Sequence, residues 1–266
     1  MAHTDAIGDL FLQMYSRVPF GYALFQSGSR KDAERWFREA EGIQALGEPF
    51  PLLYSLQGFQ YCELLLSISE RAAWQKLFSF ISPCPQSEVT SVALEECTNV
   101  AKRSEQTLAR VRKKERFGPI DEARNYLTLG RTALYASILQ SETADQRHTA
   151  AECIEQAVKE LRVAGEQDQI PEGLLSRAWL RSRSGDRVGA KVDLDEAWEI
   201  AERGPMRLLM ADIHLYRARL FFREVQYPWG SPQSDLVAAR KLIEQCGYWR
   251  RKEELEDAEA AIGSLS

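Results

Sequence analysis

Apolar residues recur along most of this chain at spacings of three and four residues, which is the period of an amphipathic α-helix. In one segment, Ala33, Phe37 and Ala40 share a face, and charged residues lie between them. Residues that favour helices, such as Ala, Leu, Glu, Arg, Gln and Lys, dominate the long segments. Long alternating runs of β-branched residues, which would indicate strands, are missing. The pattern therefore predicts an all-α fold.

One spacing occurs three times: an alanine, a large apolar residue four positions later and an alanine three positions after that. The three triplets are Ala33, Phe37 and Ala40; Ala150, Ile154 and Ala157; and Ala190, Leu194 and Ala197. Two other segments share an aromatic residue followed four positions later by glycine, Tyr54 with Gly58 and Tyr126 with Gly130. Glycine lacks a Cβ atom, so we expect a neighbouring helix to approach closely there. Together these patterns predict a repeated helical hairpin.

These residues resemble the tetratricopeptide repeat, whose unit of about 34 residues reads W-x2-L-G-x2-Y, then A-x3-F-x2-A, then P. The resemblance implies an α-solenoid of about five divergent hairpins, forming a single domain over residues 1–266. Only two hairpins keep the family spacing, from Gly21 to Ala33 and from Ala178 to Ala190, so the superhelix is expected to be irregular. The expected hairpins span residues 18–47, 51–115, 121–165, 171–204 and 209–248, with a capping helix at 249–263.

Three further helices are predicted outside the repeat pattern. One spans residues 5–16, before the first hairpin. Another spans residues 70–81 inside the second hairpin, with Ser69 as its N-cap and with Ser82-Pro83-Cys84-Pro85 ending it. The third, residues 250–262, is rich in charge, and we interpret its charged residues as a solvated face that caps the end of the solenoid.

Composition narrows the function. The 266 residues include 34 Lys and Arg against 39 Asp and Glu, a net charge of −5, which argues against a dedicated nucleic-acid binder. The chain contains no run of about 18 apolar residues, so no membrane span is predicted. The first five residues lack the features of a signal peptide, so we expect a cytoplasmic protein. The five cysteines are scattered and odd in number, which favours free thiols over a disulfide framework.

The sequence predicts no catalytic residue, no metal site and no cofactor, and so no enzyme. The three histidines, His3, His148 and His214, are far apart and belong to no catalytic or metal-binding motif. The segment Gly185–Lys191 has the wrong glycine spacing for a phosphate loop, and we interpret it as a turn between helices.

The stretch from Lys102 to Arg116 carries seven basic residues and two glutamates. It can be the solvated end of a helix, where Lys and Arg are favoured. It can also be a patch for nucleic acid, although it lacks the interleaved aromatic residues that stack on single strands. The second interpretation gives an alternative function, a nucleic-acid-associated accessory protein.

The repeat resemblance also implies a groove lined by the first helix of each hairpin, which in several family members binds an extended peptide. The positions carried over to this chain are Phe59, Glu63, Arg131, Tyr135, Trp179, Arg183, Arg219, Phe222 and Arg223. Ordinary exposed or packing residues are the other interpretation of this set. If the helices lie side by side, Arg131, Arg183 and Arg219 converge. An acidic or carboxylate-ended peptide would then neutralise their positive charge.

The leading hypothesis is therefore a non-catalytic scaffold or sensor-adaptor that binds a protein or peptide, within a larger complex. The segment from Ala238 to Glu259 also resembles the end of the tetratricopeptide arms of bacterial multidomain signalling ATPases. In those proteins the arm senses a ligand or partner. This chain contains no ATPase motif, so the resemblance implies at most such an arm or a free-standing relative of one.

Overall fold

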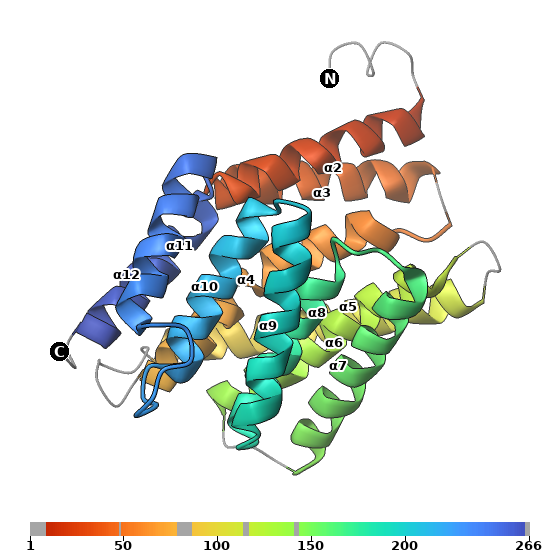
Figure 1. Cartoon of the computed structure of the whole chain (residues 1–266). Helices are drawn as coiled ribbons and strands as arrows, with labels where there is room; N and C mark the ends of the chain where they lie inside the picture. Colours follow the sequence, from red (N-terminus) through yellow and green to blue (C-terminus); the bar gives the residue numbers. More distant parts are fainter. Residues whose placement is uncertain (1–8, 48, 79–86, 114–116, 141–143, 264–266) are drawn as a thin grey trace.

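The computed structural model describes residues 9–47, 49–78, 87–113, 117–140 and 144–263. Within these residues all regular structure is helical, so the predicted all-α fold is confirmed (Figure 1). The elements are α2 (Leu10–Gln26), α3 (Arg30–Gly47), α4 (Ser55–Phe78), α5 (Ser87–Arg112), α6 (Pro119–Leu139), α7 (Ala144–Ala164), α8 (Ile170–Arg183), α9 (Arg187–Arg203), α10 (Arg207–Phe221), α11 (Pro232–Cys246), the 3-10 turn η1 (Trp249–Arg251) and α12 (Lys252–Gly263).

Five pairs of successive helices pack together: α2 with α3, α4 with α5, α6 with α7, α8 with α9 and α10 with α11. The helix α6 also packs closely against both α4 and α5. A short turn joins the two helices of the first pair, and another joins the two helices of the fourth pair. Gly28 and Gly185 adopt φ of 86° and 83° in these turns, a left-handed conformation that glycine adopts without strain. Compared with the expected hairpin ranges, α2, α6, α8 and α10 each begin earlier, α2 by eight residues and the others by one or two. Their relation to tetratricopeptide repeats stays a prediction.

The repeated alanine triplets are packing positions, because all nine side chains are almost completely buried. Gly130 acts as expected: a Cβ atom there would lie 2.5 Å from Cγ1 of Ile154, on the partner helix α7. The expectation for Gly58 is wrong. A Cβ atom at Gly58 would instead meet the carbonyl oxygen of Leu53, at 2.5 Å, so the constraint comes from the chain that enters α4.

The first helix is longer than predicted, because α2 is continuous from Leu10 to Gln26 instead of ending before the first hairpin. Met14, Val18 and Phe25 are buried at helical spacing along one face of α2. Pro19 lies inside the helix but on its exposed side. One buried face therefore holds the helix together across the proline.

The separate helix predicted over residues 70–81 does not exist, because α4 runs unbroken from Ser55 to Phe78. Ser69 is not an N-cap. Its hydroxyl is buried and donates a hydrogen bond to the carbonyl oxygen of Ala93 in α5, at 2.8 Å. The helical periodicity of this segment is confirmed as far as Phe78, but the helix begins at Ser55. The predicted break at residues 82–85 lies outside the described residues.

The last elements of the chain return to contact the first two pairs. Arg71 of α4 donates to Asp257 of α12 at 2.8 Å, and the Arg250 guanidinium lies 4.3 Å from the centre of the Phe25 ring in α2. Figure 1 shows α11 and α12, in blue, beside one end of α2, in red. The chain thus curls until its end meets its beginning, and the inner helices converge on one central region.

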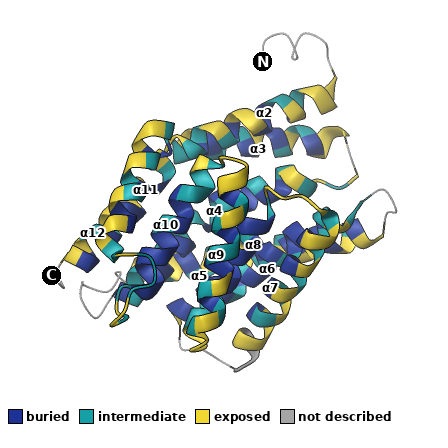
Figure 2. Cartoon of the chain, in the orientation of Figure 1, coloured by how far each residue is buried: buried dark blue, intermediate teal, exposed yellow. Residues whose placement is uncertain are grey.

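The charged C-terminal segment is not a solvated cap along its whole length, which corrects the sequence interpretation. Arg251 and Glu254 are only 5% and 6% exposed, and Leu255 and Ala258 are buried beside them. Figure 2 shows buried positions concentrated on the inner helices, including much of α10. Arg251, Glu254 and the side chain of Arg250 therefore point into the protein, where opposite charges must compensate them.

An aromatic cluster joins helices that are far apart in the sequence. Trp74 of α4 stacks on Trp179 of α8 with 3.6 Å between ring centroids, and Tyr216 of α10 meets Trp74 edge-on at 5.2 Å. Apolar and aromatic packing is therefore the main connection between α4, α8 and α10.

The four described cysteines, which are free thiols, are Cys62, Cys97, Cys153 and Cys246; Cys84 lies outside the described residues.

Candidate functional site

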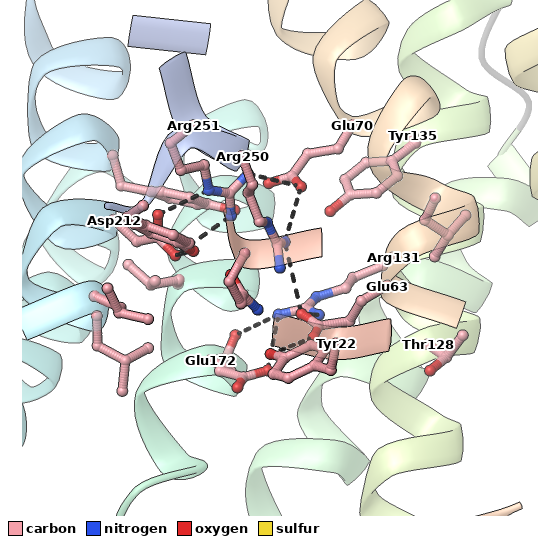
Figure 3. A pocket seen from close by; sticks show the side chains of 17 residues that line it. Tyr22, Glu63, Glu70, Thr128, Arg131, Tyr135, Glu172, Asp212, Arg250 and Arg251 are labelled. Carbon is pink, nitrogen blue, oxygen red and sulfur yellow. Dashed lines mark hydrogen bonds and ion pairs between the residues drawn. The ribbon is translucent and has the colours of Figure 1, made fainter. Parts of the chain in front are cut away.

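A polar cavity of about 170 Å³ lies where the inner helices meet η1, and we call it the central cavity (Figure 3). Its residues come from α2, α4, α6, α8, α10 and the C-terminal turn. They are Tyr22, Gln26, Glu63, Leu66, Glu70, Thr128, Arg131, Tyr135, Glu172, Leu175, Leu208, Leu209, Asp212, Tyr216, Tyr248, Arg250 and Arg251. Four carboxylates, three guanidinium groups and four phenols thus surround one small space.

Helical spacing aims these side chains inward. Glu63 and Glu70 are seven residues apart on α4, which places them two turns apart on one face. Arg131 and Tyr135 on α6 are four apart, one turn, as are Asp212 and Tyr216 on α10. Each inner helix therefore presents a short polar stripe inside an otherwise apolar buried face.

Arg251 is the best-satisfied cation of the cavity. Its Nε donates to Oδ1 of Asp212 at 2.8 Å, and its NH1 donates to Oε2 of Glu70 at 3.0 Å and to Oε1 of Glu254 at 2.6 Å. The Tyr248 hydroxyl donates to the other oxygen of Asp212 at 3.0 Å. Because the guanidinium group is buried, these carboxylates replace the water that it loses on folding.

Arg131 is held in a second group of contacts. Its Nε donates to the Ser176 hydroxyl at 2.9 Å, and its NH1 lies 3.5 Å from Oε1 of Glu63. Its NH2 lies 3.7 Å from Oε2 of Glu172, too long for a good hydrogen bond. The Tyr22 hydroxyl donates to Glu63 at 3.0 Å, so Glu63 joins α2, α4 and α6.

Arg250 differs from the other two arginines of the cavity because its Nε has no hydrogen-bond partner among the described residues. Its side chain is 6% exposed. Its NH2 lies 3.8 Å from Glu63 and 3.9 Å from Glu70, distances of ion pairs without a hydrogen bond. Figure 3 shows the guanidinium group between these two glutamates. The two glutamates compensate the positive charge, whereas the Nε–H group is left without an acceptor in the described chain.

Two acceptors at the same cavity are also unmet. Oε2 of Glu172 and Oε1 of Gln26 are buried and have no hydrogen-bond partner among the described residues. Unpaired buried polar atoms are rare in native proteins and mark places where water or a ligand is expected. The central cavity therefore holds unused donors and unused acceptors within one small volume.

The carboxylates of the cavity have different proton affinities. Burial alone would raise the pKa of Glu70, but Arg251 and Arg250 outweigh it and hold the pKa at about 2. Burial also raises the pKa of Glu172, and the nearby charge of Glu63 raises it further, so that it reaches about 8. At neutral pH Glu70 is thus ionised, whereas most of Glu172 is protonated.

The structure places three of the nine residues predicted for the groove, Glu63, Arg131 and Tyr135, in the central cavity. Phe59 is buried beside them, with the Arg131 guanidinium 5.9 Å from its ring. Trp179 is fully buried in its stack with Trp74, so it is a core residue in this conformation.

The other four predicted groove residues lie elsewhere. Arg219 is buried, donates to Glu254 at 2.9 Å and covers Trp74. Arg183 is exposed at the C-terminal end of α8. Phe222 meets Phe78 edge-on, and the exposed Arg223 lies over the Phe222 ring.

The expected convergence of Arg131, Arg183 and Arg219 on one open wall is wrong. Arg183 is exposed and does not line the central cavity, and acids of the chain itself answer the other two. Glu63 and Glu172 lie near Arg131, and Glu254 pairs with Arg219. These arginines therefore give no reason to expect an acidic peptide.

Sequence reasoning missed most of the cavity. The residues not predicted include Tyr22, Glu70, Glu172, Asp212, Arg250 and Arg251. A signal was present for Glu63, which precedes three consecutive leucines, and for Glu70, which precedes Ala72, Ala73 and Trp74. A charge at a position that helical periodicity assigns to the core is the feature to search for.

The basic stretch 102–116 contains arginines that other parts of the chain occupy. Arg103 pairs with Glu41 and covers the Tyr61 ring, and Arg110 lies 4.6 Å from the centre of the Tyr54 ring. Residues 114–116 lie outside the described residues. The described arginines are therefore partly committed to packing, which weakens the interpretation as a nucleic-acid patch.

An open groove of about 910 Å³ lies next to the central cavity, between the α2–α3 turn, α4, the start of α5 and the C-terminal segment. It combines apolar side chains, such as Ile68 and Trp249, with basic ones, such as Lys31 and Lys252. Arg250 lines both the groove and the central cavity. One residue thus connects an enclosed polar space with an open surface.

Comparisons of the chain with protein-family models, with curated proteins and with solved structures find no match. No helix in the described ranges is long and apolar enough to cross a membrane. The described residues also contain no group of three or more His, Cys, Asp or Glu side chains suited to hold a metal ion. A function for the central cavity therefore has to be inferred from the side chains that line it.

Proposed function

We propose that the protein is a non-catalytic sensor-adaptor that binds a small polar ligand in its central cavity. The observation that carries this proposal is Arg250, a buried guanidinium group whose Nε finds no hydrogen-bond partner in the described chain. The unmet oxygen of Glu172 at the same cavity supports it. A ligand that fills the cavity would satisfy groups that the protein alone leaves unsatisfied.

Binding without chemistry fits the side chains present. The lining includes no serine, cysteine, histidine or lysine, so it lacks the common nucleophile and base pairs. The raised pKa of Glu172 would suit a general acid, but no second group in the cavity is placed to attack a substrate. Most of the ionised groups neutralise one another, as in a recognition site that holds its ligand by hydrogen bonds.

The closure of the chain supports the sensing part of the proposal. Tyr248, Arg250 and Arg251 line the cavity, and the same segment brings the end of the chain against α2 and α4. A ligand bound to Arg250 would therefore favour the closed arrangement over any arrangement in which this segment has moved away. Ligand binding would change the population of the closed state by its differential affinity.

The proposal also includes a protein or peptide partner, which would bind at a different place from the groove predicted from the sequence. Tyr248, Arg250 and Arg251 line the central cavity together with three of the predicted groove residues, Glu63, Arg131 and Tyr135. The open groove beside the α2–α3 turn is the available surface, and its mixed apolar and charged lining suits a peptide. Because Arg250 borders both spaces, occupancy of the cavity would alter this groove, which is how an adaptor would report a ligand.

A thermal-shift screen of small polar compounds tests the proposed function. Compounds that bind the central cavity raise the melting temperature of the wild-type protein, because they bind the folded state. The same compounds lose that effect in Arg250→Gln and keep it in Arg183→Gln, a matched change at an exposed arginine outside the cavity. If no compound stabilises the protein, or if both variants respond as the wild type does, the proposed function is wrong.

A further inference from the structure

The unused groups of the central cavity have opposite character. Arg250 offers N–H donors and a positive charge, whereas Glu172 and Gln26 offer oxygen acceptors. Tyr135 and Tyr216 add phenol groups to the same wall. A ligand that satisfied only the donors would leave the acceptors unpaired, and a ligand that satisfied only the acceptors would leave Arg250 unpaired. The site therefore favours a molecule with both functions.

The charges of the lining exclude a ligand of one sign. With Glu172 protonated, three ionised carboxylates and three guanidinium groups surround the cavity, so a pure anion would add an unbalanced negative charge to a lining whose own charges cancel. Arg131 and Arg251 are already engaged with Glu63, Asp212 and Glu70. A pure cation would meet acceptors, but it would place a second positive charge near Arg250 without giving that group an anion.

The volume limits the size of the ligand. A space of about 170 Å³ is close to the ~150 Å³ cavity that holds benzene in an engineered protein. A polar occupant therefore has about five to eight non-hydrogen atoms. Leu66, Leu175 and Leu208 line part of the wall, which leaves room for a short aliphatic chain between two polar ends.

We propose that the central cavity binds a small zwitterion, with one carboxylate paired with Arg250 and one primary ammonium group paired with Glu172. This assignment rests on the proposed function and names its ligand class. Small amino acids have the required charges and size. The ligand carboxylate would accept hydrogen bonds from the Arg250 guanidinium. The ligand ammonium group would lower the pKa of Glu172, which would release its proton to solvent and accept a hydrogen bond from the ammonium group.

The two polar ends would be read by different parts of the chain. Glu172 lies in the first turn of α8, and Arg250 belongs to η1. A zwitterion that spans them would tie the C-terminal segment to the middle of the chain. A compound with only one of the charged ends would make only one of these contacts, so length and charge would both contribute to specificity.

Titration calorimetry with a matched panel of compounds tests the assignment. The zwitterions are glycine, alanine, serine, β-alanine and γ-aminobutyrate; the single-charge controls are propylamine and propionate. We expect at least one zwitterion to bind, and both controls to bind at least about tenfold more weakly, because each lacks one charged hydrogen bond.

Two variants assign the ends. Arg250→Gln weakens the zwitterion by about 10- to 150-fold and leaves propylamine unchanged. Glu172→Gln weakens the zwitterion and propylamine but leaves propionate unchanged, and it keeps the shape of the side chain, so it remains informative if Arg250→Gln folds poorly.

Three outcomes overturn the assignment. If propylamine or propionate binds as tightly as the best zwitterion, the ligand class is wrong. If neither variant weakens the zwitterion, the binding site is wrong; the proposed function then survives only through a different compound that needs Arg250. If neither the panel nor the wider compound screen yields a ligand, the cavity holds water alone, and both proposals fall.

Discussion

The indole rings of Trp74 and Trp179 stack with their centroids 3.6 Å apart, although 105 residues separate them along the chain. Both side chains are at most 2% exposed. This contact joins α4 to α8 behind the central cavity, and Tyr135 packs against the same stack at 5.3 Å. Trp179 therefore supports the wall of the cavity from within the core instead of offering a surface to a partner.

Replacing Trp179 by alanine is expected to lower the free energy of unfolding by about 3–5 kcal/mol, because the change leaves a large void in the core. The same replacement at Trp249, which is 42% exposed, is expected to cost much less. Urea denaturation of both variants measures the difference. Equal and small effects would mean that Trp179 does not carry the packing described for it.

The glycine of α6 gives a second test of packing. Gly130→Ala places a methyl group against Ile154 in α7, and we expect a loss of about 1–3 kcal/mol in the free energy of unfolding. Gly42→Ala in α3 is the matched control, since a Cβ atom there meets nothing within 4 Å. That control is expected to gain about 0.5–1 kcal/mol through helix propensity. The opposite order of stabilities would contradict the close approach of α6 and α7.

Glu172 gives the protein a pH dependence of stability with a definite sign. The folded pKa of about 8 lies above the ordinary value for a glutamate, about 4.3. Between these values the folded state holds a proton that the unfolded state has lost. Stability contributed by this group is therefore full below about pH 4 and falls as pH rises toward 8, by at most about 1.4 kcal/mol per pH unit.

The variant Glu172→Gln removes that dependence, so its stability relative to the wild type is expected to increase from pH 5 to pH 8. The charged and titratable groups that interact with Glu172 include Tyr22, Glu63, Arg124, Arg131, Asp212 and Arg250. They are present in both proteins, and their own titrations largely cancel in the comparison. Urea denaturation at several pH values measures it; a constant difference would show that Glu172 titrates normally.

The sequence predicts the all-α fold and the turns at Gly28 and Gly185, because helical periodicity and turn glycines act over a few residues. Phe37, Ile154 and Leu194 were recognised at core spacing, and all three are fully buried. Errors occurred where a local signal was ambiguous. Ser69 has the residue type of an N-cap, yet it is inside α4, where its hydroxyl reaches the carbonyl of Ala93.

The central cavity could not be predicted in the same way, because it depends on contacts between distant segments. Arg251 pairs with Asp212, 39 residues away, and with Glu70, 181 residues away. A run of alternating charges such as residues 250–257 is typical of an exposed helix. Only the return of the chain end to α4 turns Arg251 and Glu254 into buried residues.

The most direct test of the account is the side-chain ¹⁵N spectrum of Arg250. Its Nε–H signal, identified by its loss in Arg250→Gln, is expected to shift and to exchange more slowly with water when the best ligand from the screen is added, because the group gains a hydrogen-bond partner. The Arg183 signal serves as the control and is expected to stay unchanged. A ligand that binds while the Arg250 signal remains unaltered would contradict the claim that Arg250 is the anchor of the central cavity.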